Sequence, residues 1–312
     1  MSVLPSTGLT PRIAVLIPCY NEALTVAKVV SDFRHELPDA DIYVFDNCST
    51  DGTGPIASAA GAIVVREPRQ GKGFVVERML RTVDADYMVM VDGDDTYPAA
   101  AVHTLLAPVM DGSADMVVGA RLATFQEASF RPLHVFGNRL VRALVNWIGA
   151  TNLTDILSGY RAFSRRVSRE LPATSPGFEV ETDMTIQLLY YDFKVLEVQV
   201  AYGVRPEGSH SKLNTFRDGA RVLWKIFTLL RSAKPLTFFG SVALFFAAGG
   251  LGAGTLPILE YTTRPDHFIS HVPLAILATG LMLLSCGFLL LGVLLHSMNW
   301  RLRELHNVLT RR

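Results

Sequence analysis

The chain has 312 residues, enough for one sizeable α/β domain and a smaller additional unit. Its 29 basic and 29 acidic residues cancel, so bulk charge gives no support to a role in nucleic-acid binding. Three cysteines without a Cys-x-x-Cys pair argue against a disulfide framework and fit a reducing compartment. The first twelve residues contain no apolar segment, so no signal peptide is expected.

The first part of the chain alternates between short apolar runs and amphipathic segments. We predict strands at the bounded apolar runs and helices where apolar residues recur every three or four positions. The predicted strands are 13–17 (stopped by Pro18), 42–45, 63–65, 88–91 and 116–119, and the predicted helices are 20–36, one after the turn 49–53, 74–81 and 99–110. This alternation predicts a mostly parallel sheet with helices on both faces.

The alternation loosens after Arg121. We expect, in order, a loop at 124–132, a helix at 135–148, a turn and short strand at 155–163, a helix at 178–191, a strand at 195–200 and a polar loop at 205–212. The helix at 178–191 carries three acidic residues, Glu179, Glu181 and Asp183.

The last third of the chain has the character of a membrane protein. The pattern of residues 216–230 predicts a basic amphipathic helix. We expect this helix to lie in the lipid headgroup region rather than to pack on the α/β domain. Residues 235–259 and 268–295 contain no Asp, Glu, Lys or Arg, and each run is long enough to cross the hydrocarbon. Basic residues flank both runs on the outside, so the α/β domain and the C-terminus are expected in the cytoplasm. Glycines 249, 250, 252 and 254 favour close helix packing and would permit a homo-oligomer.

An acidic motif follows the predicted strand at 88–91. Asp92 and Asp94 are separated by Gly93, which lets the chain bend so that both carboxylates face one point. The carboxyl ends of parallel strands are where α/β sheets bind ligands, and paired carboxylates suit Mg²⁺ or Mn²⁺ shared with substrate phosphates. The alternative is an acidic turn that caps a helix starting near Pro98. We rate Asp95 below the other two, as a supporting residue or a helix cap.

Further motifs, in a fixed order along the chain, favour the metal-binding interpretation of this acidic motif over the helix cap. Residues 17–22 (Ile-Pro-Cys-Tyr-Asn-Glu), residues 46–53 (Asp-Asn-Cys-Ser-Thr-Asp-Gly-Thr) and Gly71-Lys72-Gly73 precede it. Together these stretches resemble the family 2 glycosyltransferases, which have the GT-A fold. The later stretches 155–161 and 205–213 resemble the polyprenyl-phosphate glycosyltransferases within that family, which include dolichyl-phosphate mannose synthases and bacterial undecaprenyl-phosphate sugar transferases. The resemblance covers residues 12–215.

The resemblance implies a division of the chain and a set of donor contacts. Residues 1–215 would form a GT-A (Rossmann-like) catalytic domain, residues 216–234 an amphipathic juxtamembrane helix, and residues 235–312 a two-helix transmembrane region with a basic cytoplasmic tail. Asp92 and Asp94 would hold Mg²⁺ or Mn²⁺. The residues implied to contact the nucleotide-sugar are Pro18, Tyr20, Asn21, Glu22, Asp46, Asp51, Lys72 and Asp92. Alternatively, Asn21 and Ser49 are helix caps and Lys72 is a solvated loop charge.

Arginine and lysine residues in loops are the candidates for phosphate binding. A lipid phosphate, with a second pKa of ~6, is largely ionised on arrival and needs cations rather than a general base. By resemblance, Arg121 and Arg131 face the acceptor phosphate, while Arg205, Ser211 and Lys212 close over the donor diphosphate. Asp155 is expected to bind the sugar or orient Arg161. Surface ion pairs are the better expectation for three other arginines, Arg165, Arg166 and Arg169.

These features predict an integral inner or cell membrane enzyme with its active site at the cytoplasmic face. It would transfer one hexose, with inversion, from a UDP- or GDP-hexose to undecaprenyl or dolichyl phosphate. A processive polysaccharide synthase is the first alternative, but the chain lacks a Gln-x-x-Arg-Trp motif and further spans. The second is a non-catalytic membrane scaffold with the same fold. Loss of Asp92 or Asp94 would favour a scaffold, but both residues are present.

Overall fold

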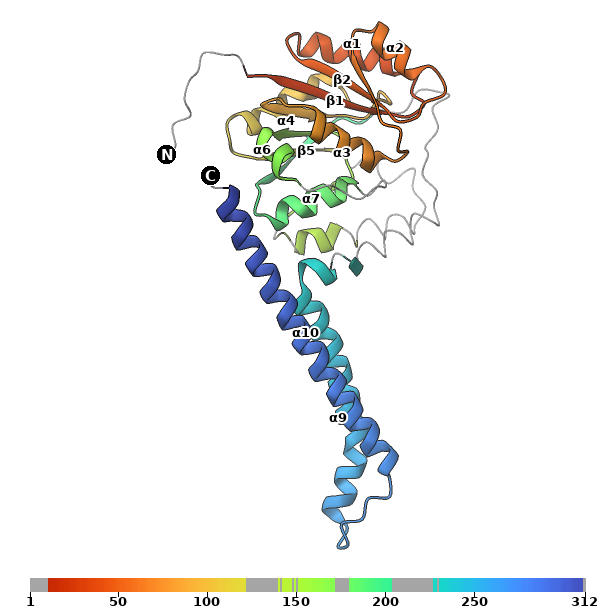
Figure 1. The fold of residues 1–312 in the computed structure, drawn as a ribbon, viewed down its shortest axis with the longest axis vertical. Helices are drawn as coiled ribbons and strands as arrows, with labels where there is room; N and C mark the ends of the chain where they lie inside the picture. The colour runs from red at the N-terminus through yellow and green to blue at the C-terminus, as the bar shows by residue number, and fades with distance from the viewer. Residues whose placement is uncertain are drawn as a thin grey trace. The chain divides into compact units, whose positions relative to one another are not determined.

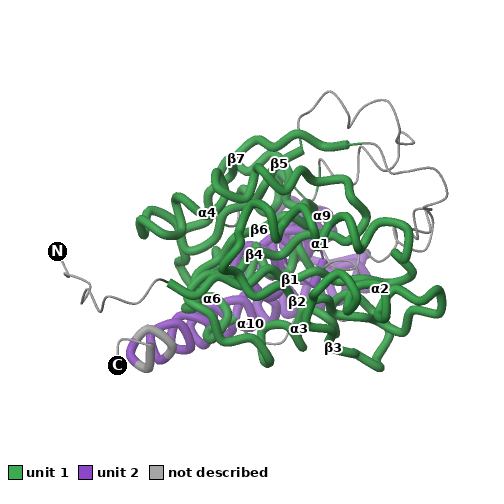
Figure 2. Tube along the Cα trace, turned by 90° about the horizontal axis from the view of Figure 1, so that it is seen from above, with its two compact units in different colours: residues 1–222 green, residues 223–312 purple. Residues whose placement is uncertain are grey.

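The computed structural model describes residues 11–121, 140, 142–147, 149, 151–171, 180–203, 227–228 and 230–310. The chain divides into two compact units, residues 1–222 and residues 223–312 (Figure 2). Several predicted features lie outside the described residues: the loop at 124–132, half of the helix at 135–148, the loop at 205–212 and most of the amphipathic helix at 216–234.

Within its described part, the first unit contains a seven-stranded sheet with the order β3-β2-β1-β4-β6-β5-β7. The strands are β1 (Ile13–Cys19), β2 (Asp41–Asp46), β3 (Ile63–Arg66), β4 (Tyr87–Met90), β5 (Met116–Arg121), β6 (Arg161–Ser164) and β7 (Val195–Val200). Strands β1 to β4 pair in parallel, as do β5 and β7, while β6 runs antiparallel to both of its neighbours. The predicted mostly parallel sheet is confirmed.

Helices cover both faces of this sheet. They are α1 (Val26–Glu36), α2 (Thr53–Ala59), α3 (Lys72–Thr82), the short 3₁₀ turn η1 (Ala99–Ala101), α4 (Val102–Met110), α6 (Arg165–Glu170) and α7 (Val180–Tyr190). Helices α1, α2 and α4 share one apolar core with alternate residues of the central strands. Helix α3 contacts α6 and α7, and Figure 1 shows these three on the opposite side of β1 and β2 from α1 and α2.

Two boundaries in the first unit differ from the sequence-based expectation, and one helix there was not expected. Strand β1 continues through Pro18, because the pairing of β1 with β4 ends at Leu16 and the missing proline N–H falls beyond that ladder. Helix α1 begins at Val26 rather than at Tyr20, and Leu24, expected on its apolar face, is 73% exposed. Helix α6 was not predicted, because its six residues carry no helical apolar period.

Within its described part, the second unit contains two long helices, α9 (Pro235–Thr263) and α10 (Val272–Thr310), which pack against each other. Both are long and apolar enough to cross a membrane. Gly250 lies where a β-carbon would come within 3.2 Å of both the Met282 side chain and the Ala278 carbonyl, so this glycine permits close packing of the two helices as predicted. The connection between the helices, residues 264–271, lies later in the chain than the two apolar runs indicate, because Glu260 belongs to α9 and α10 begins at Val272.

Candidate active site

The carboxyl ends of β1, β2 and β4 lie side by side because these strands are parallel neighbours. The loop after each strand contains one non-glycine residue with a left-handed backbone: Asn21 (φ 54°), Cys48 (φ 64°) and Asp95 (φ 59°). Such conformations are uncommon and tend to gather at functional sites. The candidate site is therefore this edge of the sheet, where the sequence motifs converge.

The loops after β1 and β2, which we call the loop pair (residues 20–25 and 46–53), are joined by hydrogen bonds. The Thr50 N–H donates to Asn21 Oδ1 at 2.8 Å, and the Asn21 N–H donates to Ser49 Oγ at 2.9 Å. The Ala23 N–H donates to Asp51 Oδ2 at 3.0 Å. Asn21 and Ser49 thus link the two loops and do not cap helices, which rules out that alternative.

The two aspartates of the loop pair accept hydrogen bonds from neutral groups. Asp46 Oδ1 accepts the Ser49 N–H at 3.1 Å, and Asp51 Oδ1 accepts the Thr53 hydroxyl at 2.5 Å. Burial by itself would raise the pKa of Asp51, but the bonds from Thr53 and Ala23 outweigh it and lower this pKa. Pro18, Tyr20 and Glu22 lie at the same edge, at the end of β1 and just beyond it. Nucleotide contact by this set stays a prediction.

Buried Asn47 fixes the chain that leads into α3. Its Oδ1 accepts the Gly71 N–H at 2.8 Å, while its Nδ2 donates to the carbonyl oxygens of Glu67 and Arg69 at 3.1 and 2.8 Å. The side chain therefore ties the end of β2 to the segment immediately before Lys72. Lys72 itself is the first residue of α3 rather than part of a loop.

The acidic turn after β4 is held from both sides. Thr25 donates to the Gly93 carbonyl at 2.6 Å, and a β-carbon at Gly93 would lie 2.5 Å from Cys19 Sγ, so the turn packs tightly on β1 and α1. Asp94 is 3% exposed and accepts the Thr96 hydroxyl at 2.6 Å. Asp95 pairs with Lys28 at 2.7 Å, consistent with its lower rating.

Lys72 forms ion pairs with two carboxylates from different elements. Its Nζ lies 2.6 Å from Asp92 Oδ1 and 2.5 Å from Glu181 Oε1 of α7. Burial alone would lower the pKa of Lys72, but the two carboxylates more than offset this and raise it above its usual range. The ammonium is therefore charged and lies at the acidic motif, so Lys72 is not a solvated loop charge.

The other side of Asp92 is formed by the turn before β6. A β-carbon at Gly159 would overlap the Asp92 carboxylate, so only glycine permits this approach. Buried Tyr97 supports the turn, because its hydroxyl lies 3.1 Å from Ser158 Oγ and accepts the Gly159 N–H at 3.3 Å. Burial, followed by the charge of Asp92, raises the pKa of Tyr97, and the hydroxyl therefore stays protonated at neutral pH.

Asp155 holds Arg121, which corrects one sequence-based expectation. Arg121 Nε and Nη2 donate to the two Asp155 carboxylate oxygens at 2.7 and 2.9 Å. The guanidinium also lies over the Tyr202 ring, 5.4 Å from its centroid. Arg161, expected as the partner of Asp155, is fully buried and donates instead to the Ser158 carbonyl at 2.9 Å and to Thr185 Oγ1 at 2.8 Å. Arg161 therefore supports the core beneath the site.

Not every predicted residue can be placed. Arg131, Arg205, Ser211 and Lys212 lie outside the described residues. Arg165, Arg166 and Arg169 form ion pairs at the surface with Asp84, Asp86, Asp115 and Glu170. The expectation of surface ion pairs is therefore confirmed for all three arginines.

The donor groups at the acidic motif fit a hard divalent cation. Asp92 and Asp94 offer carboxylate oxygens, and no larger cluster of three or more His, Cys, Asp or Glu side chains suited to a metal occurs in the part of the chain that the structure describes. Mg²⁺ and Mn²⁺ are commonly held by one or two carboxylates, with substrate phosphates and water completing the coordination. The pair therefore suits an ion that arrives together with a diphosphate.

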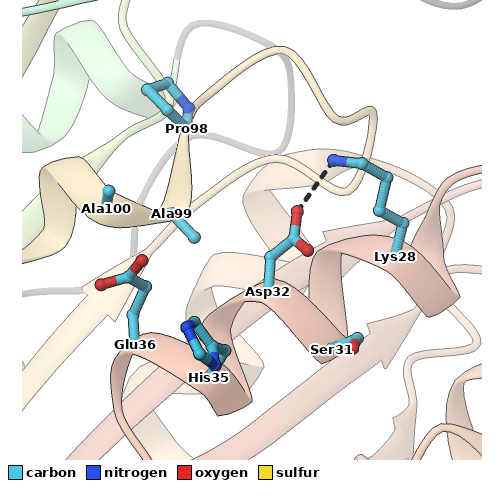
Figure 3. Close-up of a pocket in the computed structure, with 8 residues that line it drawn as sticks. All are labelled: Lys28, Ser31, Asp32, His35, Glu36, Pro98, Ala99 and Ala100. Carbon is cyan, nitrogen blue, oxygen red and sulfur yellow. Dashed lines mark hydrogen bonds and ion pairs between the residues drawn. The ribbon is translucent and has the colours of Figure 1, made fainter.

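A surface hollow of about 480 Å³ lies apart from these carboxylates, between α1 and η1 (Figure 3). Its lining includes Lys28, Asp32, His35 and Glu36 of α1, and Figure 3 shows the Lys28–Asp32 ion pair at one end. It includes neither Asp92 nor Asp94 and is no part of the candidate site.

Sequence reasoning missed four residues of the site: Asn47, Tyr97, Gly159 and Glu181. Asn47 and Gly159 lie within the motif stretches 46–53 and 155–161, but no role was predicted for either residue. Glu181 lies on a predicted helix rich in acidic residues. Its burial at 4% exposure, and its pairing with a lysine from another element, depend on tertiary packing that no local pattern reports.

Comparisons with known proteins identify the family of this chain. A family model described as glycosyl transferase family 2 matches residues 14–171. Glycosyltransferase AglJ of Haloferax volcanii is 36% identical over 283 residues, covering 90% of this chain and 92% of that protein. Undecaprenyl-phosphate mannosyltransferase of Micrococcus luteus is 27% identical, covering 65% of this chain and 88% of that protein.

A solved structure also resembles the fold of this chain. Glucosyl-3-phosphoglycerate synthase from Mycobacterium tuberculosis, crystallised with Mn²⁺, UDP-glucose and phosphoglyceric acid, gives a TM-score of 0.58 at 25% sequence identity. The likeness covers 72% of this chain and 79% of that structure.

Proposed function

Because this chain belongs to glycosyl transferase family 2, we propose that it transfers one hexose from a nucleoside-diphosphate donor to a polyprenyl phosphate, with inversion at the anomeric carbon. One observation carries the proposal: Asp92 and Asp94, a carboxylate pair directly after β4, occur in the same chain as two helices long and apolar enough to cross a membrane. The first feature suits the leaving group, and the second suits a lipid acceptor. The name of the Micrococcus luteus relative, which specifies undecaprenyl phosphate, supports this acceptor class.

The leaving group sets the demands on the acidic turn. Negative charge builds on the diphosphate as the glycosidic bond breaks. Asp92 and Asp94 would hold Mg²⁺ or Mn²⁺, which supplies Lewis-acid neutralisation of that charge when bound. The bonds from Thr96 to Asp94 and from Thr25 to the Gly93 carbonyl keep the two carboxylates in a fixed relation. The loop pair would frame the base and ribose.

The acceptor phosphate needs cations and no general base, because a phosphate monoester is largely ionised at neutral pH. Asp155 uses the Nε and one Nη2 hydrogen of Arg121, which leaves the remaining N–H donors of the fork for phosphate oxygens. We propose Arg121 and Arg131 as acceptor contacts, and Arg205, Ser211 and Lys212 as contacts of the donor diphosphate.

The orientation in the membrane follows from the charges around the spans. Arg231 and Lys234 precede α9, and Arg301 and Arg303 lie in the last part of α10. The positive-inside rule then places the first unit and the C-terminus in the cytoplasm, where the lipid phosphate would meet a cytoplasmic nucleotide-sugar.

The full-length protein in membranes, supplied with labelled nucleotide-sugars, tests this function. The panel comprises UDP-glucose, UDP-galactose and GDP-mannose as donors, and undecaprenyl phosphate, dolichyl phosphate and undecaprenol as acceptors. We expect a single sugar on a phosphorylated prenol, labile to mild acid and lost with excess chelator. The Lys28→Gln variant, altered outside the site, should behave like the parent. A polymeric product, equal use of the neutral alcohol, or no incorporation from any donor would overturn the proposal.

A further inference from the structure

The Lys72 ammonium lies beside a carboxylate that the proposed function assigns to the divalent ion. Lys72 Nζ is 2.6 Å from Asp92 Oδ1, within direct hydrogen-bonding distance of a proposed metal ligand. The Lys72 side chain is 15% exposed, and the Glu181 side chain that also contacts it is 5% exposed. A buried carboxylate needs a cationic partner nearby, so Glu181 keeps the ammonium at this place.

Asp92 has little freedom to avoid this competition. Its carboxylate packs directly against Gly159, where a β-carbon would overlap it. Lys72 occupies the other oxygen, Oδ1. A divalent ion bound to Asp92 would therefore lie within a few ångströms of a fixed positive charge, and like charges at such distances repel strongly in a partly buried site. The ammonium must be displaced from Asp92 or its charge must be offset.

We propose that Lys72 is an internal competitor of the divalent ion for Asp92, and that Glu181 is the positioning residue that keeps Lys72 in place. The proposal rests on the metal role of Asp92 and Asp94 in the proposed function. It implies that the free protein binds the ion weakly. The donor diphosphate, which adds negative charge next to Lys72, would relieve the competition, so that ion and donor bind together.

Titration of the full-length, nucleotide-free protein with Mn²⁺ tests this directly, with the unbound ion followed by electron paramagnetic resonance. Lys72→Gln should bind Mn²⁺ on the order of tenfold more tightly, because one positive charge is removed. Glu181→Gln should bind it more weakly, because the amide oxygen can still accept from the Lys72 ammonium and keep it beside Asp92, while one of the two carboxylates that offset its charge is lost. Lys72→Arg keeps the charge and should restore the parent affinity.

Two further variants make the outcome unambiguous. Lys28→Gln is the matched control, since Lys28 pairs with the neighbouring Asp95, and its Mn²⁺ affinity should equal that of the parent. Asp94→Asn should lose Mn²⁺ binding; if it binds as well as the parent, the metal site of the proposed function fails. If Asp94→Asn loses binding while Lys72→Gln shows equal or weaker affinity, only the competition is overturned. Thermal melting identifies any variant that fails to fold, in which case Lys72→Met replaces Lys72→Gln.

Discussion

Two regions at the same edge of the sheet hold their carboxylates in different ways. In the loop pair, Asp46 and Asp51 accept hydrogen bonds from neutral N–H and O–H groups. The other region, which we call the charged wall, pairs its carboxylates with cations and consists of Lys72, Asp92, Arg121, Asp155 and Glu181. Neutral hydrogen bonds within the chain can persist when a charged ligand binds, whereas an ion pair can be exchanged for the charge of a ligand. The loop pair therefore sets the shape of the site, and the charged wall responds to what binds there.

Asp94→Asn should give the largest effect. Loss of one of two carboxylates for the divalent ion is expected to lower kcat/KM on the order of a thousandfold, which corresponds to several kcal/mol of transition-state stabilisation. Folding should change little, because an amide oxygen can still accept from Thr96. Asp95→Asn, which loses only the pair with exposed Lys28, is the control and should stay within about threefold of the parent. Turnover and thermal melting measure both; near-normal activity of Asp94→Asn would remove the metal role.

Asp155→Asn tests whether an ion pair of the charged wall also supports the fold. Asp155 is 4% exposed and binds Arg121 through both oxygens, so the variant leaves a half-buried guanidinium without its carboxylate. We expect a loss of about 3 kcal/mol in the free energy of unfolding, measured by chemical denaturation, together with a higher KM for the lipid acceptor. The control Asp84→Asn breaks an exposed pair with Arg165 and should leave the free energy of unfolding almost unchanged. An equal loss of unfolding free energy in Asp155→Asn and Asp84→Asn would show that the buried ion pair supports the fold no more than the exposed one.

The fold could be predicted from sequence where local pattern and burial agree. The apolar runs of β1 to β5 are bounded by turn residues, and the ordered motifs indicated the GT-A fold and the family, both of which are confirmed by the comparisons. Prediction failed where tertiary contacts decide. Helix α1 starts late because Asn21 has a left-handed backbone and its loop is hydrogen-bonded to the loop after β2.

The site shows the same division. Asp92 and Asp94 could be proposed from their spacing at a strand end. The partners of Asp92 and Asp155 could not, because Lys72 and Arg121 reach these aspartates from distant positions in the chain. Two flanking glycines indicated a loop at Lys72, yet Asn47 fixes the preceding segment and α3 begins there.

Asn47→Ala should show that a neutral network can cost nearly as much as an ion pair. The variant removes three hydrogen bonds at a residue that is 5% exposed and leaves the Gly71 N–H without its acceptor. We expect a loss of about 2 kcal/mol in the free energy of unfolding and a higher KM for the donor, since Lys72 follows this segment. Ser113→Ala, which removes an exposed hydroxyl bond to the Pro108 carbonyl, should have little effect. An unchanged KM for the donor would show that Asn47 does not influence the position of Lys72 in the charged wall.

The smallest effect is a pH dependence confined to the loop pair. Hydrogen bonds from Thr53 and Ala23 lower the pKa of Asp51 below its ordinary value of 3.8. The folded state therefore binds this proton less readily than the unfolded chain, and the resulting stabilisation is present above about pH 4 and disappears as the pH falls through the folded value. Thermal melting of the parent and of Asp51→Asn between pH 3 and pH 7 measures it: the two should differ at neutral pH and converge in acid. A difference that stays constant with pH would mean that the Asp51 charge contributes nothing to the loop pair, which would then be held by shape alone.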